Sequence, residues 1–202
     1  MTIELNEVTL PGSEQALSLL ADEGQLTCIT GGSGERRTRC LYMLMGFEAP
    51  SGGCVSVDGE PLAGGCINHL RKHIAFVPAS LDTVGQLVPY EPPTIQDVLA
   101  LRSNRGLAIS EADVEEECRR AAGIANPLQQ PASGRQDSLR RQKVLLLAVA
   151  VLRRKPVLLV DSPLASTATY LQQQARQEGR TVIVATDDAA VVRLADNVVS
   201  LV

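Results

Sequence analysis

The sequence is short of aromatic residues, of strong net charge and of long apolar runs. Aromatic residues make up 2% of the 202 residues and tryptophan is absent, so the core must be built from Leu, Val, Ala and Ile. The net charge of −4 gives the chain as a whole no electrostatic reason to bind nucleic acid. The longest apolar stretch, residues 144–152, is far too short to cross a bilayer. We therefore expect a globular protein with no nucleic-acid partner, which reaches a membrane only through other proteins.

Cysteine pairs at close spacing are also lacking. The five cysteines include no C-x-x-C pair, and their odd number argues against a closed disulfide framework. The acidic residues Glu4 and Glu7 stand where a signal peptide would need basic ones. A reducing cytosol is the simplest interpretation. We expect Cys28 and Cys40 to be buried as small apolar residues rather than to take part in redox chemistry.

What the sequence does have is an alternation of apolar strands with helices, which is typical of an α/β sheet. Thr94 and Ser110 are plausible helix caps, and Gly123 is a plausible helix stop. A chain of this length suits one domain, with room for a subdomain. The predicted strands are 2–10 (as an edge strand), two within 15–30, 54–58, 73–79, 156–163, 181–188 and 197–202; the predicted helices are 38–46, 94–102, 110–123, 138–155, 170–179 and 189–195.

Residues 31–40, GGSGERRTRC, come close to a phosphate-binding loop. In the pattern G-x-x-x-x-G-K-[ST], glycines let backbone N–H groups converge on phosphates, the lysine reaches the β- and γ-phosphates, and the hydroxyl binds Mg²⁺. Gly31 and Thr38 match this pattern, but Arg36 replaces its second glycine and Arg37 its lysine. A wide planar guanidinium is a poor substitute for a compact ammonium, and a long side chain is a poor substitute for glycine beside a phosphate.

Taken in order, the segments resemble the nucleotide-binding subunit of an ABC transporter over nearly the whole chain, with compact lipoprotein exporters and efflux pumps as the nearest relatives. The resemblance implies an α/β P-loop NTPase core with a mainly parallel sheet, an antiparallel β arm and a helical subdomain at about 80–150, all in one domain over 1–202. The segments that carry it are 24–62 (strand, P-loop, helix and hairpin), 73–79 (strand into the Q-loop), 92–99, 138–163 (signature helix and Walker B), 180–188 and 194–201.

The resemblance also implies a nucleotide site, here in a vestigial form. Its metal side would consist of Thr38 and Asp161. The remaining nucleotide-binding positions are Gly31, Gly32, Ser33, Gly34, Glu35, Arg36, Arg37, Arg39 and, from the signature, Gln142.

No catalytic residue of the family pattern is intact. Ser162 stands where the family has the glutamate that activates water, and a serine hydroxyl is a negligible base at neutral pH. Asp187 takes the place of the switch histidine, and Ala79 that of the Q-loop glutamine. Residues 139–141, Leu-Arg-Arg, replace the serine and two glycines of the signature, and no aromatic precedes Tyr42 to stack on adenine. Each loss removes a separate contribution to positioning or to charge stabilisation.

We therefore expect a degenerate subunit, a pseudo-ATPase, that binds no cofactor and docks on transmembrane permease subunits, with or without a second nucleotide-binding subunit as homo- or heterodimer. It would lie on the cytoplasmic, inner face of the membrane, with residues 76–100 near its docking surface. One alternative is a working ATPase with divergent motifs, which would bind ATP and Mg²⁺. Another is a free-standing regulatory domain that has left the transporter.

Three smaller hypotheses concern charged and polar side chains. Arg36 or Arg37 either folds into the phosphate volume and pairs with Asp161 or Asp187, or points to solvent. In a homodimer the same two arginines would face Arg140 and Arg141 of the partner, where like charges would oppose closure. The spacing of residues 69 and 73, both histidine, can place two metal ligands on one helix face, although the sequence offers no third ligand.

Overall fold

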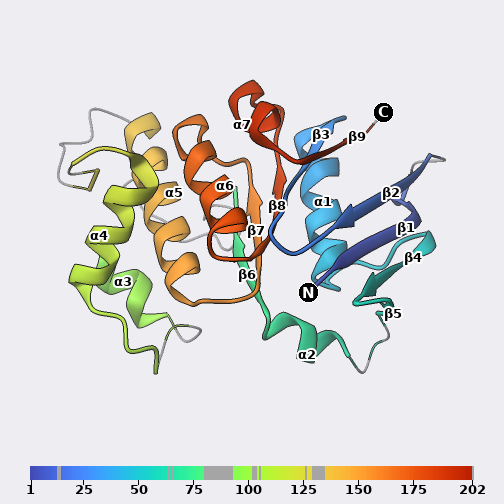
Figure 1. The fold of residues 1–202 in the computed structure, drawn as a ribbon, viewed down its shortest axis with the longest axis horizontal. Helices are drawn as coiled ribbons and strands as arrows, with labels where there is room; N and C mark the ends of the chain where they lie inside the picture. Colours follow the sequence, from blue (N-terminus) through green and yellow to red (C-terminus); the bar gives the residue numbers. More distant parts are fainter. Residues whose placement is uncertain are drawn as a thin grey trace.

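The computed structural model describes residues 1–12, 15–62, 64, 66–79, 93–101, 104, 106–125, 127–128 and 135–201. Two sheets and a group of helices form the molecule (Figure 1), with the antiparallel sheet on the right of that view and helices α3, α4 and α5 on the left. In the part of the chain that the structure describes, no helix combines the length and the apolar character needed to cross a membrane.

The larger sheet is parallel and has the strand order β6-β7-β8-β3-β9. Every residue of its two neighbouring strands β7 and β8 is buried, as expected where helices cover both faces. Alternate residues serve opposite faces: Leu158 packs toward α5 and α6, and Leu159 packs toward α1. The strands are β3 (Leu26–Gly31), β6 (Ile74–Val77), β7 (Val157–Asp161), β8 (Thr181–Ala185) and β9 (Asn197–Leu201).

The smaller sheet is antiparallel, with the order β2-β1-β4-β5. The prediction that the first strand lies at an edge is wrong, because Ile3 is paired with Ala21 on one side and with Val57 on the other. Alternation of apolar residues reports which face of a strand is buried, and it carries no information on how many neighbours the strand has. The strands are β1 (Ile3–Thr9), β2 (Ala16–Ala21), β4 (Gly52–Val57) and β5 (Glu60–Pro61).

Helix α1 (Gly34–Leu44) begins four residues before the predicted start at residue 38, so that predicted boundary is wrong. The chain turns sharply at Gly31 and Gly32, whose φ values are 74° and 57°. Ser33 then caps the helix, and its side chain accepts a hydrogen bond from the backbone N–H of Arg36 at 3.3 Å. A serine cap followed by Glu35 in the first turn stabilises a helix start, and that signal outweighs the glycines before it.

Two further helices begin at the residues predicted to cap them. Capping boxes on Thr94 and Ser110 open α3 (Ile95–Ala100) and α4 (Glu111–Ala122), and Gly123 ends α4 with φ 66°. Helix α5 spans Arg135–Leu152, so the cations after residue 152 follow the helix instead of forming its last turn. Short helices complete the fold: α2 (Ile67–Arg71), the 3₁₀ turn η3 (Ala165–Thr167), α6 (Ala168–Arg176) and α7 (Ala189–Leu194).

Both cysteines beside residues 31–39 are buried, as predicted. Cys28 and Cys40 are fully buried, and burial raises the pKa of each thiol to about 11. A thiol with so high a pKa holds almost no thiolate at neutral pH, so neither residue is activated for redox chemistry.

Candidate nucleotide site

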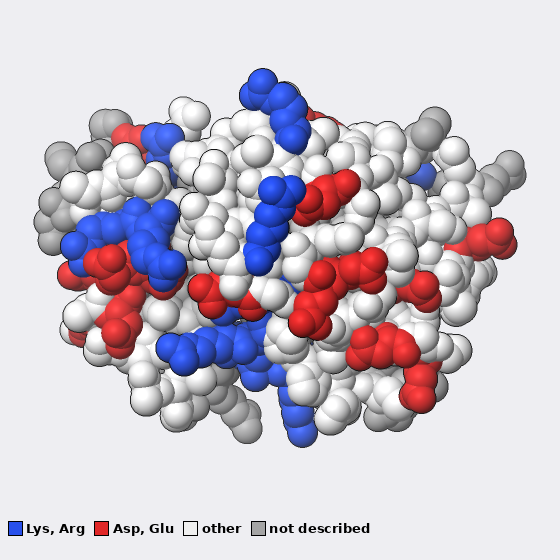
Figure 2. Space-filling view, in the orientation of Figure 1, with Lys and Arg blue, Asp and Glu red and all other residues white. Residues whose placement is uncertain are grey.

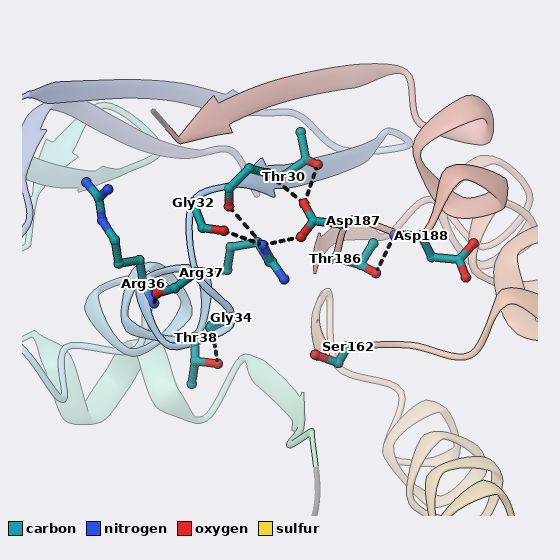
Figure 3. A network of polar contacts seen from close by, with 12 residues as sticks. Thr30, Gly32, Gly34, Arg36, Arg37, Thr38, Ser162, Thr186, Asp187 and Asp188 are labelled. Atoms are coloured by element: carbon teal, nitrogen blue, oxygen red, sulfur yellow. Dashed lines mark hydrogen bonds and ion pairs between the residues drawn. The ribbon is translucent and has the colours of Figure 1, made fainter.

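The candidate site lies at the edge of the parallel sheet where β3, β7 and β8 end. Because these strands are parallel neighbours, Gly31, Asp161 and Ala185 come to the same edge, and α1 starts there too. Figure 3 shows Arg37, Thr38, Ser162 and Asp187 gathered around this edge, from three separate stretches of the chain. The structure therefore brings these candidate residues together in one region.

Arg37 closes the loop that precedes its own helix. Its Nη1 donates to the carbonyl oxygens of Gly31 at 2.8 Å and of Gly32 at 3.2 Å, and it forms an ion pair with Asp187 Oδ2 at 2.5 Å. The Arg37 side chain is only 11% exposed, whereas that of Asp187 is 54% exposed. Of the two alternatives for the arginines, the structure shows the ion pair for Arg37, and its partner is Asp187 rather than Asp161.

Asp187 is held on both of its oxygens. Its Oδ1 accepts from the backbone N–H of Gly31 at 2.8 Å and from Thr30 Oγ1 at 2.9 Å. The pKa of Asp187 is lowered, first by the Gly31 N–H and then by the Thr30 hydroxyl. Desolvation opposes this shift, and Arg37 adds a smaller lowering contribution. The carboxylate thus stays ionised and anchors the end of β3 to the turn after β8.

The other two arginines of the loop lie elsewhere. Figure 3 shows Arg36 pointing away from Asp187, so it is not the arginine that fills this region. Arg39 lies on another side of α1, where its Nε donates to Glu48 Oε1 at 2.9 Å. Identical residue types within one turn of helix therefore have three different surroundings, which their sequence spacing did not distinguish.

Asp161, at the end of β7, is buried and surrounded by hydroxyl groups. It is 3% exposed, and its Oδ2 accepts from Thr38 Oγ1 at 2.6 Å. The side chain of Ser162 donates to its Oδ1 at 3.2 Å. The two residues that the sequence assigned to the metal side of the site, Thr38 and Asp161, are therefore in direct contact.

Lys143 is a residue of this region that the sequence analysis missed. Its Nζ donates to the backbone oxygen of Ser162 at 2.6 Å. Desolvation lowers the pKa of Lys143, and the nearby charge of Asp161 opposes that shift. Its position directly after Gln142 was visible in the sequence, but nothing in the sequence showed that this face of α5 reaches the end of β7.

The signature positions lie on α5. Gln142 is buried, Arg140 is exposed and Arg141 is half-buried. Arg140 and Arg141 border a small cavity of about 180 Å³ together with Asp137 and Ser166. They therefore lie beside the end of α4 and the 3₁₀ turn rather than beside the Arg37–Asp187 pair.

Two further predictions concern α2 and the Q-loop region. His69 Nε2 and His73 Nε2 lie 3.3 Å apart, yet no group of three or more metal-ligating side chains forms among the residues that the structure covers. Ala79 follows β6 at the edge of the described segment, and residues 80–92 of the expected docking surface lie outside the described residues.

Comparison with known proteins bears on this arrangement. A family model for the ABC transporter matches residues 15–165. The chain is 27% identical to an ATP-dependent lipid A-core flippase of Bordetella pertussis, over 92% of this chain and 31% of the flippase. It is 32% identical to an aliphatic sulfonates import ATP-binding protein of Cupriavidus necator, over 87% of this chain and 56% of that protein. It thus spans about a third of the first relative and just over half of the second.

The fold is shared with solved ATP-binding cassettes. A dimeric cassette in a post-hydrolysis state, bound to ADP and phosphate, superposes with a TM-score of 0.71 at 22% identity, covering 98% of this chain and 94% of that chain. A bacterial Atm1-family ABC exporter with ATP bound superposes with a TM-score of 0.69 at 20% identity, covering 99% of this chain and 37% of that one. The predicted fold, with its parallel sheet, antiparallel sheet and helices, is confirmed, and because the family model covers most of the sequence, this chain belongs to the ABC transporter family.

Proposed function

We propose that the chain is the ATP-binding-cassette part of a transporter and that its own nucleotide site is structural or regulatory rather than hydrolytic. In this proposal it docks on transmembrane permease subunits at the cytoplasmic face of a membrane and pairs with a second cassette. The functions of these two relatives, lipid flipping and sulfonate import, differ in their cargo, so they support a role in transport without naming what is carried.

The observation that carries this proposal is the Arg37–Asp187 ion pair across the loop. An arriving triphosphate would have to compete with Asp187 and with two carbonyl oxygens for the Arg37 guanidinium. Three amides of the loop and helix start are also in use, because Gly31 N–H donates to Asp187 and the N–H groups of Arg36 and Arg37 donate to Ser33. A phosphate site works through converging, available N–H groups, so the ion pair and these occupied amides argue against ATP on the phosphate side.

The chemistry beside the loop supports the same conclusion. Asp187 is an ionised carboxylate just after β8. Its negative charge would repel the negative charge of a triphosphate placed beside it. Ser162 holds its hydroxyl on Asp161 and provides no general base. Even a bound nucleotide would therefore find no group that activates water at either position.

One observation favours the alternative of a working ATPase. Thr38 and Asp161 are in contact at 2.6 Å, and a hydroxyl beside a carboxylate is the pair that holds Mg²⁺ in P-loop enzymes. The metal side of the site thus fits Mg²⁺, although the ion pair and the occupied amides argue against the nucleotide on the phosphate side.

A titration of the purified chain with Mg·ATP, combined with a phosphate-release assay, tests the proposal. We expect weak binding and no release above that of the Asp161→Asn variant, which removes one charge from the metal side. Affinity in the micromolar range, with phosphate release that is lost in Asp161→Asn, would establish the alternative. Because partners can complete a cassette, the assay is repeated with the chain bound to its membrane complex.

A further inference from the structure

A second polar region lies at the opposite edge of the parallel sheet from the loop of residues 31–39. There, the connection from α5 into β7 and the start of β8 enclose a cavity of about 550 Å³, within the usual range of small-molecule sites. In the orientation of Figure 1, Figure 2 shows basic side chains beside acidic ones on the part of the surface where α5 runs into β7. None of the residues discussed for the nucleotide site lines this cavity.

Arg180 brings a buried donor to the cavity. It is 8% exposed, and its Nη2 donates to the backbone oxygen of Val151 at 3.0 Å. Its Nη1 is buried and has no hydrogen-bond partner among the residues that the structure describes. A buried guanidinium nitrogen without a partner is costly, so this atom favours an acceptor from outside the chain.

Gln174 brings a buried acceptor to the same cavity. It is 2% exposed, and its Oε1 likewise has no partner within the described residues. Two residues that line the cavity therefore each hold one buried polar atom, a donor and an acceptor, that is unmatched among the described residues. A ligand that suits both must accept a hydrogen bond at one atom and donate one at another.

The charges around the cavity favour an anion. Of its three carboxylates, Glu117 is 7% exposed in its side chain and already accepts from Tyr170 and from Arg120 Nη1, the latter at 3.1 Å. Glu23 is bound by the amino group of Met1 at 2.7 Å. Two cations that border the cavity, Arg154 and Lys155, have no ion pair among those found in the described part of the chain, and only Glu178 is left to balance them and Arg180.

We propose that this cavity binds a small oxyanion, either a phosphate or a carboxylate, that also carries an O–H or N–H donor. Arg180 Nη1, Arg154 and Lys155 would contact the anionic group through charge-assisted hydrogen bonds, and Gln174 Oε1 would accept from the donor. The site is separate from the nucleotide site and does not depend on whether that site binds ATP.

Calorimetric titration of the full chain with inorganic phosphate and, in a separate arm, with malate tests this proposal and distinguishes the two sources of negative charge. We expect saturable binding in at least one arm, weakened at least about tenfold by the double variant Arg154→Gly/Lys155→Gln. Neither substitution touches the core, and glycine suits the positive φ of 51° at residue 154, so the double variant should fold.

Two further variants make the result specific. Arg180→Lys keeps a charge at the cavity but loses the forked guanidinium, so it should also weaken binding. Arg119→Gln is the matched control. Arg119 is an exposed cation next to Arg120 in the chain, but unlike Arg120 it does not line the cavity. It should leave the affinity unchanged. No saturable binding of either anion, or binding that the double variant leaves unchanged, would overturn the proposal.

Discussion

The two edges of the parallel sheet use arginines of low exposure in opposite ways. At the edge where the strands end, Arg37 has two carbonyl oxygens and Asp187 as partners, all supplied by the protein. At the edge where they begin, Arg180 has one carbonyl oxygen and leaves Nη1 unmatched among the described residues. The comparison teaches that a cation in a cavity is not evidence for a ligand until its hydrogen-bond partners are counted.

A glycine-to-alanine substitution at each edge tests how closely other atoms pack against the backbone there. Gly31→Ala should lower the free energy of unfolding by about 3 to 5 kcal/mol, since the added Cβ combines overpacking with the strain of a positive φ. That Cβ would lie 2.3 Å from the backbone oxygen of Leu201. Gly179→Ala, with the nearest atom 3.9 Å away, should cost only about 1 kcal/mol. Urea unfolding curves measure both, and equal costs would contradict the contrast.

Removing the Arg37–Asp187 ion pair should restore nucleotide affinity at the edge where the strands end. In the double variant Arg36→Gly/Arg37→Lys the guanidinium that bridges Asp187 and the loop carbonyls is gone, and the residues match a phosphate-binding pattern. We expect Mg·ATP affinity to rise at least about tenfold in a fluorescence titration. Arg39→Lys is the matched control on the same helix, because Arg39 pairs with Glu48 away from the site. Unchanged affinity in the double variant would mean that the ion pair does not close the site.

The edge of the sheet where the strands begin contains a residue in an unfavourable backbone conformation. Arg154 has φ 51°, which glycine adopts without penalty. Arg154→Gly should therefore raise the free energy of unfolding, by about 0.5 kcal/mol after the loss of chain entropy is allowed for. Arg119→Gly within α4 is the opposite case and should destabilise by about 1 kcal/mol. A thermal melt that ranks the two variants the other way would contradict this assignment.

Asp187 should give the smallest effect, present at neutral pH and lost in acid. Its pKa is lowered in the folded state, so its contribution is present above the pKa of the unfolded chain and is lost as pH falls through the folded value, below about pH 4. Asp187→Asn should cost about 0.5 kcal/mol at neutral pH, because Asp187 is half exposed and solvent screens its charge. The difference from the unsubstituted chain should vanish in acid. A difference that persists at low pH would show that the carboxylate charge is not what holds the turn.

Much of the fold could be predicted because its signals are local. Thr94, Ser110 and Gly123 mark helix ends through contacts within a few residues, and the structure has them in those roles. The start of α1 was missed, since a glycine-rich stretch and a serine cap give conflicting local signals and only the packed structure shows which prevails. Likewise, one strand's pattern does not reveal its second neighbour, and β1 was misplaced at an edge for that reason.

By itself, the sequence determined the alternation of strands and helices, the family resemblance and the altered residues of the loop. Each of these depends on residue order or on neighbours in the chain. Only the tertiary structure decided that Arg37, rather than Arg36, pairs with Asp187, and that Arg180 lines a cavity at the far edge of the sheet. These contacts join segments far apart in the chain, so they exist only once parallel strands bring their ends to a common edge.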